Sequence, residues 1–425
     1  MRSAVFNPAL LFLVALTACG GANAPNDGAV SAPLSERICG ASAVGSDGRS
    51  LPPPQLQVPK GFAIETIASI ETARELAALP NGDLLVGTVS SDICIVPNAE
   101  GTPGAPHVFV TIPDSRAAGI TFAPSLSEIF VGSHNHVWAI PYHGERKAPQ
   151  IRRIADVRTG PIAPGSDGDV HKTTSVAYTG GLLYVAVGSS CDARMDHGRQ
   201  PCTEIDPTRA AISVMNPNGS NIIQRARRIR NAIALAVNPK TGSLWVGGAG
   251  QDHLHPFGHP YEYLDNLSAH PGDADYGWPV CEENHHQYWR GYDCSGTVIP
   301  LVELPAYSTI IGATFYPVHQ GGTYAFPAQY RGGLFVASHG SWHTDTNGCL
   351  ADPPHVVFVP MNGDQPAKPV DWSNPTTQWI EFVTGFQTGC LTRHGRSTGI
   401  TVGPQGSLFV GDGDAGLVYR VRPTP

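Results

Sequence analysis

The chain has 425 residues, with 48 glycines, 38 prolines and only 15% charged residues. No long pattern of helical period stands out, so this composition predicts many short strands joined by turns. The formal net charge of −8 argues against a nucleic-acid-binding protein, which would need a basic face. The length would allow two or three domains, but single all-β domains are often this long.

The N-terminus has the pattern of an export signal. Arg2 precedes an apolar run at 9–16, and Leu16-Thr17-Ala18-Cys19 resembles a bacterial lipobox. The apolar run is too short to span a membrane. We expect a signal peptide at 1–19, a lipid anchor at Cys19 and export to the bacterial periplasm or cell surface. An ordinary signal peptide cut nearby is the alternative. Residues 20–57, rich in Ala, Gly, Ser and Pro, are typical of a flexible tether before a domain at 58–425.

Eight cysteines remain after Cys19, and an even number in an exported chain indicates disulfides. None forms a CxxC or CxxCH motif, which argues against a zinc ribbon, a redox dithiol and attached haem. Sequence alone does not fix the connectivity. The pairing we favour is Cys191–Cys202, Cys281–Cys294, Cys349–Cys390 and Cys39–Cys94.

One hairpin pattern recurs along the domain: an apolar strand, a Pro/Gly turn and a second strand that ends in glycine. The copies lie at 76–87, 120–132, 176–188, 235–247, 313–340 and 400–411. Radial repetition of this unit predicts an all-β, six-bladed β-propeller with four-stranded antiparallel blades. A sandwich or two barrels would be the alternative. The late strand 417–421 and the early strand 62–68 could complete one sheet and close the ring.

Residues just before the first strand of each hairpin would crowd one mouth of the central channel. Arg116, His171 and Arg396 each lie eight residues before the turn position, and Arg230 lies nine before it. Any one of them alone would be a solvated loop residue. Together, three guanidiniums and an imidazole in one concavity would bind a polyanion.

Several motifs in order along the chain resemble a known family. They are VHKTT followed by LLYVAVGSSCD, RIRNAIALAVNPKTGSLW, DYGWP, HGSW, and HGR with GPQGSLFVGDGDAGLVYRV. This series is similar to the L-sorbosone dehydrogenase and soluble aldose (glucose) dehydrogenase family over about residues 60–422. The resemblance implies a six-bladed propeller that uses pyrroloquinoline quinone (PQQ) with Ca²⁺.

The resemblance also implies roles. His171 would be the base, since its ordinary pKa lies near neutral. Arg230 would stabilise negative charge developing on the quinone. From its position two residues before His171, Asp169 would orient the base or contact the sugar, and a solvated loop carboxylate is the alternative. The cofactor contacts implied are Arg230, Asn231, Arg396, Arg393, Arg116, His339 and Trp342.

Calcium would be held by the backbone carbonyls of Gly250 and Gln251, as oxygen ligands suit a hard cation. The sequence departs from the family here. Gly248 replaces an acidic residue, Ala232 and Ala234 replace a proline and a glycine, and 253–259 replaces an acidic run. These changes put cofactor affinity in doubt.

Histidines and tryptophans remain ambiguous. Loop histidines at 134, 136, 253, 255, 259, 285 and 286 could bind a transition metal, but hydrogen bonds to their surroundings are the simpler reading. Trp278, Trp289 and Trp342 could stack on sugar or cofactor, though we expect at least two of them to be packing residues.

The sequence thus favours PQQ-dependent oxidation of a sugar or aldehyde. A separate electron acceptor, a cytochrome or a quinone, would be needed. One alternative is a non-catalytic propeller that binds carbohydrate or protein with a decayed cofactor site. Another is a calcium-dependent hydrolase or lactonase, which would need a ring of carboxylates and Asn where this chain has Arg and His.

Overall fold

The structure is a computed structural model that describes residues 38–42, 55–166, 168–192, 195–196, 200–251, 258–345 and 347–425. Cys19, most of the expected tether, and His253 and His255 lie outside these residues. In the described part of the chain, no helix is long and apolar enough to cross a membrane.

Six antiparallel sheets of four principal strands form the described domain. The first three sheets contain β3 (Ala73–Ala78), β4 (Leu84–Thr88), β5 (Asp92–Val96) and β6 (His107–Thr111); β7 (Gly119–Ala123), β8 (Glu128–Gly132), β9 (His136–Pro141) and β10 (Arg152–Asp156); β11 (Thr174–Thr179), β12 (Leu182–Val187), β15 (Ala211–Met215) and β16 (Ile223–Arg227). The last three contain β17 (Ala232–Val237), β18 (Leu244–Gly248), β19 (Glu262–Asn266) and β23 (Val302–Leu304); β24 (Ile310–Phe315), β25 (Leu334–Ser338), β26 (His355–Val359) and β29 (Ile380–Val383); β32 (Ser397–Val402), β33 (Leu408–Asp412), β34 (Leu417–Pro423) and β2 (Phe62–Ser69).

The remaining elements are short. Two-residue strands add to the blades or pair with each other: β1 (Ala41–Ser42), β13 (Met195–Asp196), β14 (Gln200–Pro201), β20 (Ala274–Asp275), β21 (Cys281–Glu282), β22 (His286–Gln287), β27 (Met361–Asn362), β28 (Gln365–Pro366), β30 (Gln387–Thr388) and β31 (Thr392–Arg393). The helical turns are of the 3₁₀ type: η1 (Pro124–Leu126), η2 (Leu267–Ala269) and η3 (Ala328–Tyr330).

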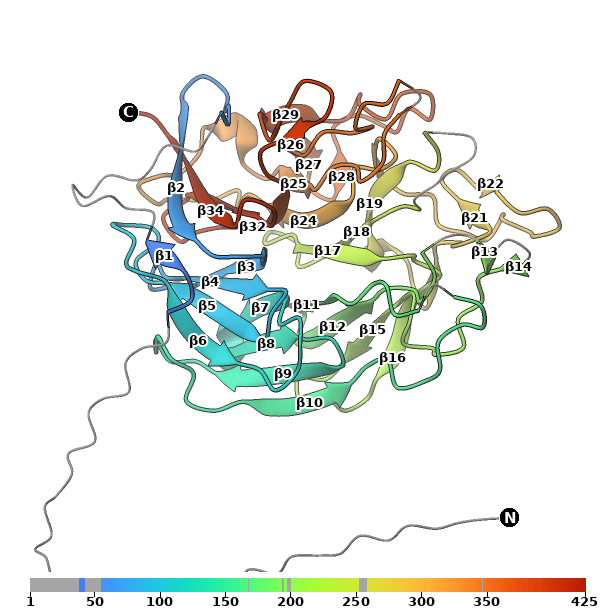
Figure 1. Ribbon diagram of the computed structural model, residues 1–425, viewed down its shortest axis with the longest axis horizontal. Coiled ribbons are helices and arrows are strands. Elements are labelled where there is room, and N and C mark those ends of the chain that lie inside the picture. Colours follow the sequence, from blue (N-terminus) through green and yellow to red (C-terminus); the bar gives the residue numbers. More distant parts are fainter. Residues whose placement is uncertain are drawn as a thin grey trace, which may run out of the picture. The chain divides into compact units, whose positions relative to one another are not determined.

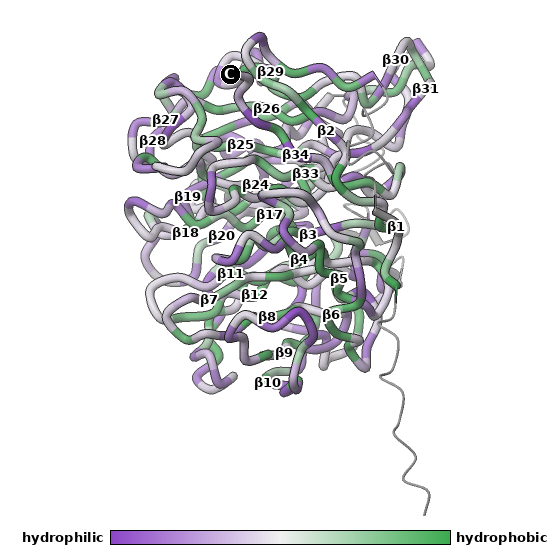
Figure 2. Tube along the Cα trace, turned by 90° about the vertical axis from the view of Figure 1, so that its left-hand side faces the viewer, coloured by the Kyte–Doolittle hydropathy of each residue, from purple (hydrophilic) through white to green (hydrophobic). Residues whose placement is uncertain are grey.

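The sheets are the blades of a six-bladed β-propeller, as the sequence predicted. Figure 1 shows β3, β7, β11, β17, β24 and β32 gathered around the centre, with the later strands of each blade further out. Each predicted hairpin supplies the first two strands of a blade. Figure 2 shows apolar strand segments within the body and polar segments in many of the connecting loops.

The predicted closure of the ring is confirmed. β2 pairs antiparallel with β34, so the start of the domain completes the last blade. Phe62 at the start of β2 packs its ring 4.7 Å from Phe326 and 5.2 Å from Phe382, measured between centroids. These contacts join the first strand to the buried core between the last two blades. Closure therefore rests on apolar burial as well as on strand pairing.

All four favoured disulfides form: Cys39–Cys94, Cys191–Cys202, Cys281–Cys294 and Cys349–Cys390. Cys191–Cys202 fixes the loop that follows β12, next to the site described below. Trp278 and Trp289 are packing residues, whereas the Trp342 side chain is 57% exposed. The expectation that at least two tryptophans pack is therefore confirmed.

Candidate active site at the mouth of the propeller

The N-terminal ends of the inner strands lie at one level around the central axis. A Cβ on Gly119 would meet the Thr174 carbonyl oxygen at 2.1 Å, and one on Gly399 would meet the Arg74 carbonyl oxygen at 2.3 Å. Only glycine allows neighbouring inner strands to approach this closely. The residues that precede or begin these strands therefore share one mouth, as predicted from their spacing.

His171 and Arg230 form the first cluster at this mouth. The His171 side chain is 9% exposed, and its Nδ1 lies 2.7 Å from the Ser189 carbonyl oxygen. That acceptor requires the proton on Nδ1, which leaves the Nε2 lone pair available. Burial and the nearby Arg230 charge lower the pKa of His171 to about 3. The imidazole is therefore neutral at any ordinary working pH.

Arg230 is held by three carbonyls and one carboxylate. Its Nε donates to the Asp192 carbonyl at 2.9 Å, and Nη2 donates to Asp192 Oδ1 at 2.6 Å. Nη1 donates to the carbonyls of Gly250 at 2.5 Å and Ala249 at 3.4 Å. The same Asp192 Oδ1 lies 3.8 Å from His171 Nε2. Asp192 thus joins the base and the guanidinium, a role the sequence analysis missed although it quoted the Ser-Ser-Cys-Asp run.

Asn231 and Gly188 complete the first cluster. A Cβ on Gly188 would lie 2.5 Å from His171 Cβ and 2.6 Å from Asn231 Oδ1. The glycine at the end of the repeated hairpin is therefore what lets these two side chains pack side by side.

We expect Gly188→Ala to lower the free energy of unfolding by about 1–3 kcal/mol, because the added methyl must displace His171 or Asn231. Urea unfolding checks this. Gly296→Ala is the matched control, since nothing lies within 4 Å of a Cβ there. Equal stability of Gly188→Ala and the parent chain would contradict the packing described.

The structure pairs Asp169 with Arg209 and His134 rather than with the base, and its alternative contact with the sugar stays a prediction. Arg209 Nη1 donates to Asp169 Oδ1 at 2.7 Å, His134 Nε2 bonds its other oxygen, and Arg158 Nε lies 3.7 Å away. Within the described chain, no hydrogen bond joins Asp169 to the His171 imidazole, so its predicted contact with the base does not form. Buried cations attract this carboxylate more strongly than a neutral imidazole could.

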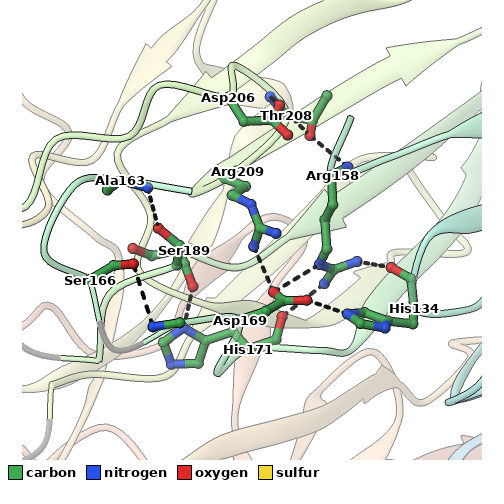
Figure 3. A network of polar contacts seen from close by, with 12 residues as sticks. His134, Arg158, Ala163, Ser166, Asp169, His171, Ser189, Asp206, Thr208 and Arg209 are labelled. Carbon is green, nitrogen blue, oxygen red and sulfur yellow. Dashed lines mark hydrogen bonds and ion pairs between the residues drawn. The ribbon is translucent and has the colours of Figure 1, made fainter. Parts of the chain in front are cut away.

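Arg158 instead supports the base through the backbone. Its Nη2 donates to the carbonyls of His171 at 2.8 Å and Thr173 at 2.9 Å. Figure 3 shows Asp169 between Arg209, Arg158 and His134, with His171 alongside. Arg158 and Arg209 lie outside the repeated register, so spacing alone could not have found them.

The second cluster lies on the last two blades. Arg396 is fully buried, donates from Nε to the His339 carbonyl at 2.7 Å and also bonds the Gly340 carbonyl. Its Cζ lies 3.7 Å from the centre of the Trp342 ring, and that of Arg393 lies 5.2 Å from it. His339 Nδ1 bonds the Ser397 carbonyl at 2.9 Å, and burial with the Arg396 charge holds the pKa of His339 well below its usual range. The predicted His339, Trp342, Arg393 and Arg396 therefore do come together.

Arg74 joins this cluster and was missed, because it lies inside β3 rather than before it. With His339, Trp342 and Asp414 it lines a cavity of about 160 Å³. Burial lowers the pKa of Arg74, and the Arg116 charge lowers it further. Among the described residues, no hydrogen bond or ion pair engages the guanidinium of Arg74 or Arg116. The charges of Glu75 and Asp414 act on Arg74, but these two guanidiniums make no hydrogen bond within the described chain, and they fit a ligand with several carboxylates, as PQQ has.

The described residues fit calcium less well than they fit PQQ. The Gly250 carbonyl, one of the two predicted ligands, already accepts the Arg230 guanidinium, whose charge would repel a cation there. The side-chain Oε1 of Gln251 is buried and has no hydrogen-bond partner in the described part of the chain. Gln251 thus offers this oxygen and its predicted carbonyl, and two oxygens fall short of the six to eight that calcium takes. We therefore derive no step through calcium.

Most of the described histidines outside the site make side-chain hydrogen bonds, whereas the His286 ring lies 4.3 Å from the Tyr288 ring, measured between centroids. His136 bonds Asp156, His259 bonds Glu283, and His285 bonds Thr297. In the part of the chain described, the sole cluster of three possible metal ligands is Cys191, Cys202 and Glu204, and its cysteines form a disulfide. The simpler reading of the described histidines is thus supported.

The buried neutral histidine makes stability depend on pH. An unfolded histidine binds a proton below about pH 6.5, whereas folded His171 does not until about pH 3. Its contribution is therefore present above about pH 6.5 and is lost as the pH falls towards 3. At about 1.4 kcal/mol per pKa unit, the loss is on the order of 5 kcal/mol. We expect urea unfolding to show a smaller decrease between pH 7 and pH 4 for His171→Gln than for the parent chain; parallel curves would contradict this.

Several solved structures with this fold are named as sugar dehydrogenases or carbohydrate-active enzymes. The holo PQQ domain of pyranose dehydrogenase from Coprinopsis cinerea superposes with a TM-score of 0.69 at 19% identity, covering 87% of this chain and 98% of that one. A calcium structure of a Trichoderma reesei carbohydrate-active enzyme of family AA12 gives 0.69 at 15% identity, covering 89% and 100%. The PQQ-bound aldose sugar dehydrogenase of Streptomyces coelicolor gives 0.54 at 17% identity, covering 86% and 100%.

The sequence comparisons give less information than the structure comparison does. An uncharacterized protein of Borreliella burgdorferi is 21% identical over 379 residues, which is 86% of this chain and 90% of that protein. No known family profile matches the chain. At these identities the likenesses establish a shared fold, which is the propeller of PQQ-dependent sugar dehydrogenases that the motifs predicted.

Proposed function

We propose that the protein is a PQQ-dependent dehydrogenase that oxidises a sugar or sugar aldehyde. The observation that carries this proposal is the neutral, buried His171, fixed by Ser189 so that Nε2 is free, beside the Arg230 guanidinium. The solved structures with this fold support the cofactor class.

The chain's own residues supply the general base and the fixed positive charge that the reaction needs. His171 Nε2 accepts the proton of the substrate hydroxyl, and Arg158 holds the His171 backbone in place. Arg230 places a fixed positive charge where negative charge develops. Arg74, Arg116 and Arg393 would pair with carboxylates of the cofactor, and Trp342 would lie against it. The bound quinone would supply the hydride acceptor.

A non-catalytic, carbohydrate-binding propeller is the second candidate. The contact between Arg230 and the Gly250 carbonyl favours it, because that contact occupies a predicted calcium ligand.

Titration of the full chain with PQQ, with and without calcium, separates the two candidates. Saturable binding followed by absorbance, with aldose-dependent dye reduction, supports the dehydrogenase. We expect Arg116→Ala to weaken PQQ binding about tenfold and Arg290→Ala, on an exposed loop, to leave it unchanged. If PQQ does not bind at concentrations on the order of 50 µM, the non-catalytic, carbohydrate-binding propeller is the candidate that remains.

Export and a lipid anchor at Cys19 stay predictions of the sequence. Labelling with a fatty-acid analogue, lost in Cys19→Ser, tests them.

A further inference from the structure

A channel runs along the propeller axis on the side away from the mouth. It has a volume of about 320 Å³ and is lined by the inner strands β3, β7, β11, β17, β24 and β32. It begins beside Glu75 on β3 and Ser175 on β11, and it reaches Pro124 and Tyr178 at the C-terminal ends of β7 and β11. Pro124 is exposed and Tyr178 is partly exposed, so this end meets solvent. We call this space the axial channel.

The axial channel is polar enough to hold water. Each inner strand ends the strand order of its sheet, so one of its edges has no strand partner. Backbone N–H and C=O groups on such an edge need water or another partner. Thr121, Thr314 and Thr401 add hydroxyl groups to the lining, and the buried Ser175 Oγ has no hydrogen-bond partner in the described part of the chain. A polar space of this size can hold a chain of ordered water molecules.

Glu75 is the one described residue lining the axial channel that has a charged side chain. Within the described chain, no hydrogen bond or ion pair engages its carboxyl group, and Oε1 is enclosed. The side chain is partly exposed although protein surrounds it, as expected for a group that faces an internal channel. Burial raises the pKa of Glu75 to about 8, against the charge of Arg74, which lowers it. The carboxyl group is therefore mostly neutral at pH 7 and ionises as the pH rises through about 8.

Arg74 is the charged group that acts on Glu75. The strands β4, β7 and β32 pack against β3 and carry no charged side chain, while Asp412 on β33 accepts the backbone N–H of Arg396 at 2.8 Å. Arg74 lines the cavity of about 160 Å³ at the mouth, where the Arg116 charge also acts on it. Consecutive residues of β3 thus present a cation to the mouth and a carboxyl group to the axial channel.

This pair of residues couples anion binding at the mouth to proton binding in the channel. An anion at Arg74 and Arg116 offsets the positive charge that favours the ionised form of Glu75, so the pKa of Glu75 rises further. The linkage is reciprocal, so ionised Glu75 must weaken anion binding as the pH rises through about 8.

We propose that Glu75 takes up a proton from water in the axial channel when an anion with several carboxylates binds at the mouth, and releases it when the anion leaves. The carboxylate gains one O–H bond, the proton comes from bulk solvent along the channel water, and no electron is transferred. The inference rests on the proposed function only where the anion is identified as PQQ.

Proton uptake is measured on the full chain by calorimetry in buffers of different ionisation heat, with benzene-1,3,5-tricarboxylate as the probe. At pH 8.5 we expect roughly half a proton to be taken up per bound anion, and almost none at pH 6, where Glu75 is already neutral. Glu75→Gln has the shape of the neutral carboxyl group and should take up almost none at either pH. Binding by the parent chain should weaken between pH 7 and pH 9 about threefold more than binding by this variant.

The matched control is Glu303→Gln. Burial also raises the pKa of Glu303 to about 8, but Glu303 lies on β23, the outermost strand of the fourth blade. This variant should keep the proton uptake of the parent chain. Anion binding without proton uptake at pH 8.5, or equal uptake in Glu75→Gln and the parent, would overturn the inference.

The same titration with PQQ separates this inference from the proposed function. If the tricarboxylate binds with proton uptake and PQQ does not bind, the proposed function fails and the proton site stands. If PQQ alone binds, the proton count is made with PQQ, and if neither anion binds, the inference is wrong. A crystal structure of the protein tests the route, since ordered water should lie within hydrogen-bond distance of the Glu75 carboxyl group and the Ser175 hydroxyl. An axial channel without ordered water would overturn that route.

Discussion

His171→Gln should reduce aldose-dependent dye reduction by the PQQ-loaded chain about 10³-fold in kcat/KM. The glutamine amide can still donate to the Ser189 carbonyl, so the loop keeps its anchor, but it offers no basic nitrogen for the substrate hydroxyl. The expected loss is in kcat rather than in KM, because the base acts in the transition state. Steady-state kinetics with saturating cofactor measure it.

The control for this variant is His136→Gln. His136 begins the third strand of the second blade and bonds Asp156 on its outermost strand. PQQ affinity should be the same in His171→Gln and the parent chain within about twofold, since the base does not pair with carboxylates. A His171→Gln enzyme with more than a tenth of parental kcat would show that another group removes the proton.

The fold was predictable because the same hairpin pattern recurs six times along the sequence. Each hairpin carries its own turn and its own strand-end glycine, so local pattern and global architecture agree. The closure by 62–68 was predictable for a similar reason: an unpaired edge strand at 417–421 requires a partner.

The site was predictable only where it follows the repeat. His171, Arg230 and Arg396 precede inner strands and were found by spacing. Asp192 and Arg209 lie on loops, and only the folded chain brings them to His171 and Asp169. Sequence spacing carries no information on which of several carboxylates an arginine will choose.

The partners of Asp169 show why nearness in sequence is a poor guide to contacts between charged side chains. It lies two residues before His171, and nearness in sequence suggested a contact with the base. Burial would raise the pKa of Asp169, but hydrogen bonds from Arg209 and His134 and the charges of Arg209 and Arg158 lower it. Arg209 lies 40 residues further along the chain. Ion pairing between buried groups outweighs a contact with a neutral ring.

Arg230→Gln should lower kcat/KM about 10²–10³-fold and should also change the pH profile. The Arg230 charge is the second cause, after burial, of the low pKa of His171. Without that charge the pKa of His171 rises from about 3 towards its ordinary value, and activity should acquire an acid limb at higher pH than in the parent enzyme. Profiles of kcat/KM between pH 4 and pH 8 measure this. Arg227→Gln, at a half-exposed ion pair away from the mouth, should change neither quantity.

The same variant decides what the Gly250 carbonyl can do. Removing the guanidinium frees this oxygen, and Gln251 Oε1 in the next residue has no hydrogen-bond partner among the described residues. If the pair is a latent calcium site, calcium should bind Arg230→Gln more tightly than the parent chain in calorimetry, and Gln251→Ala in the same background should reverse the gain. If affinity is unchanged, the two oxygens do not form a cation site. An unchanged pH profile would separately show that burial alone keeps His171 neutral.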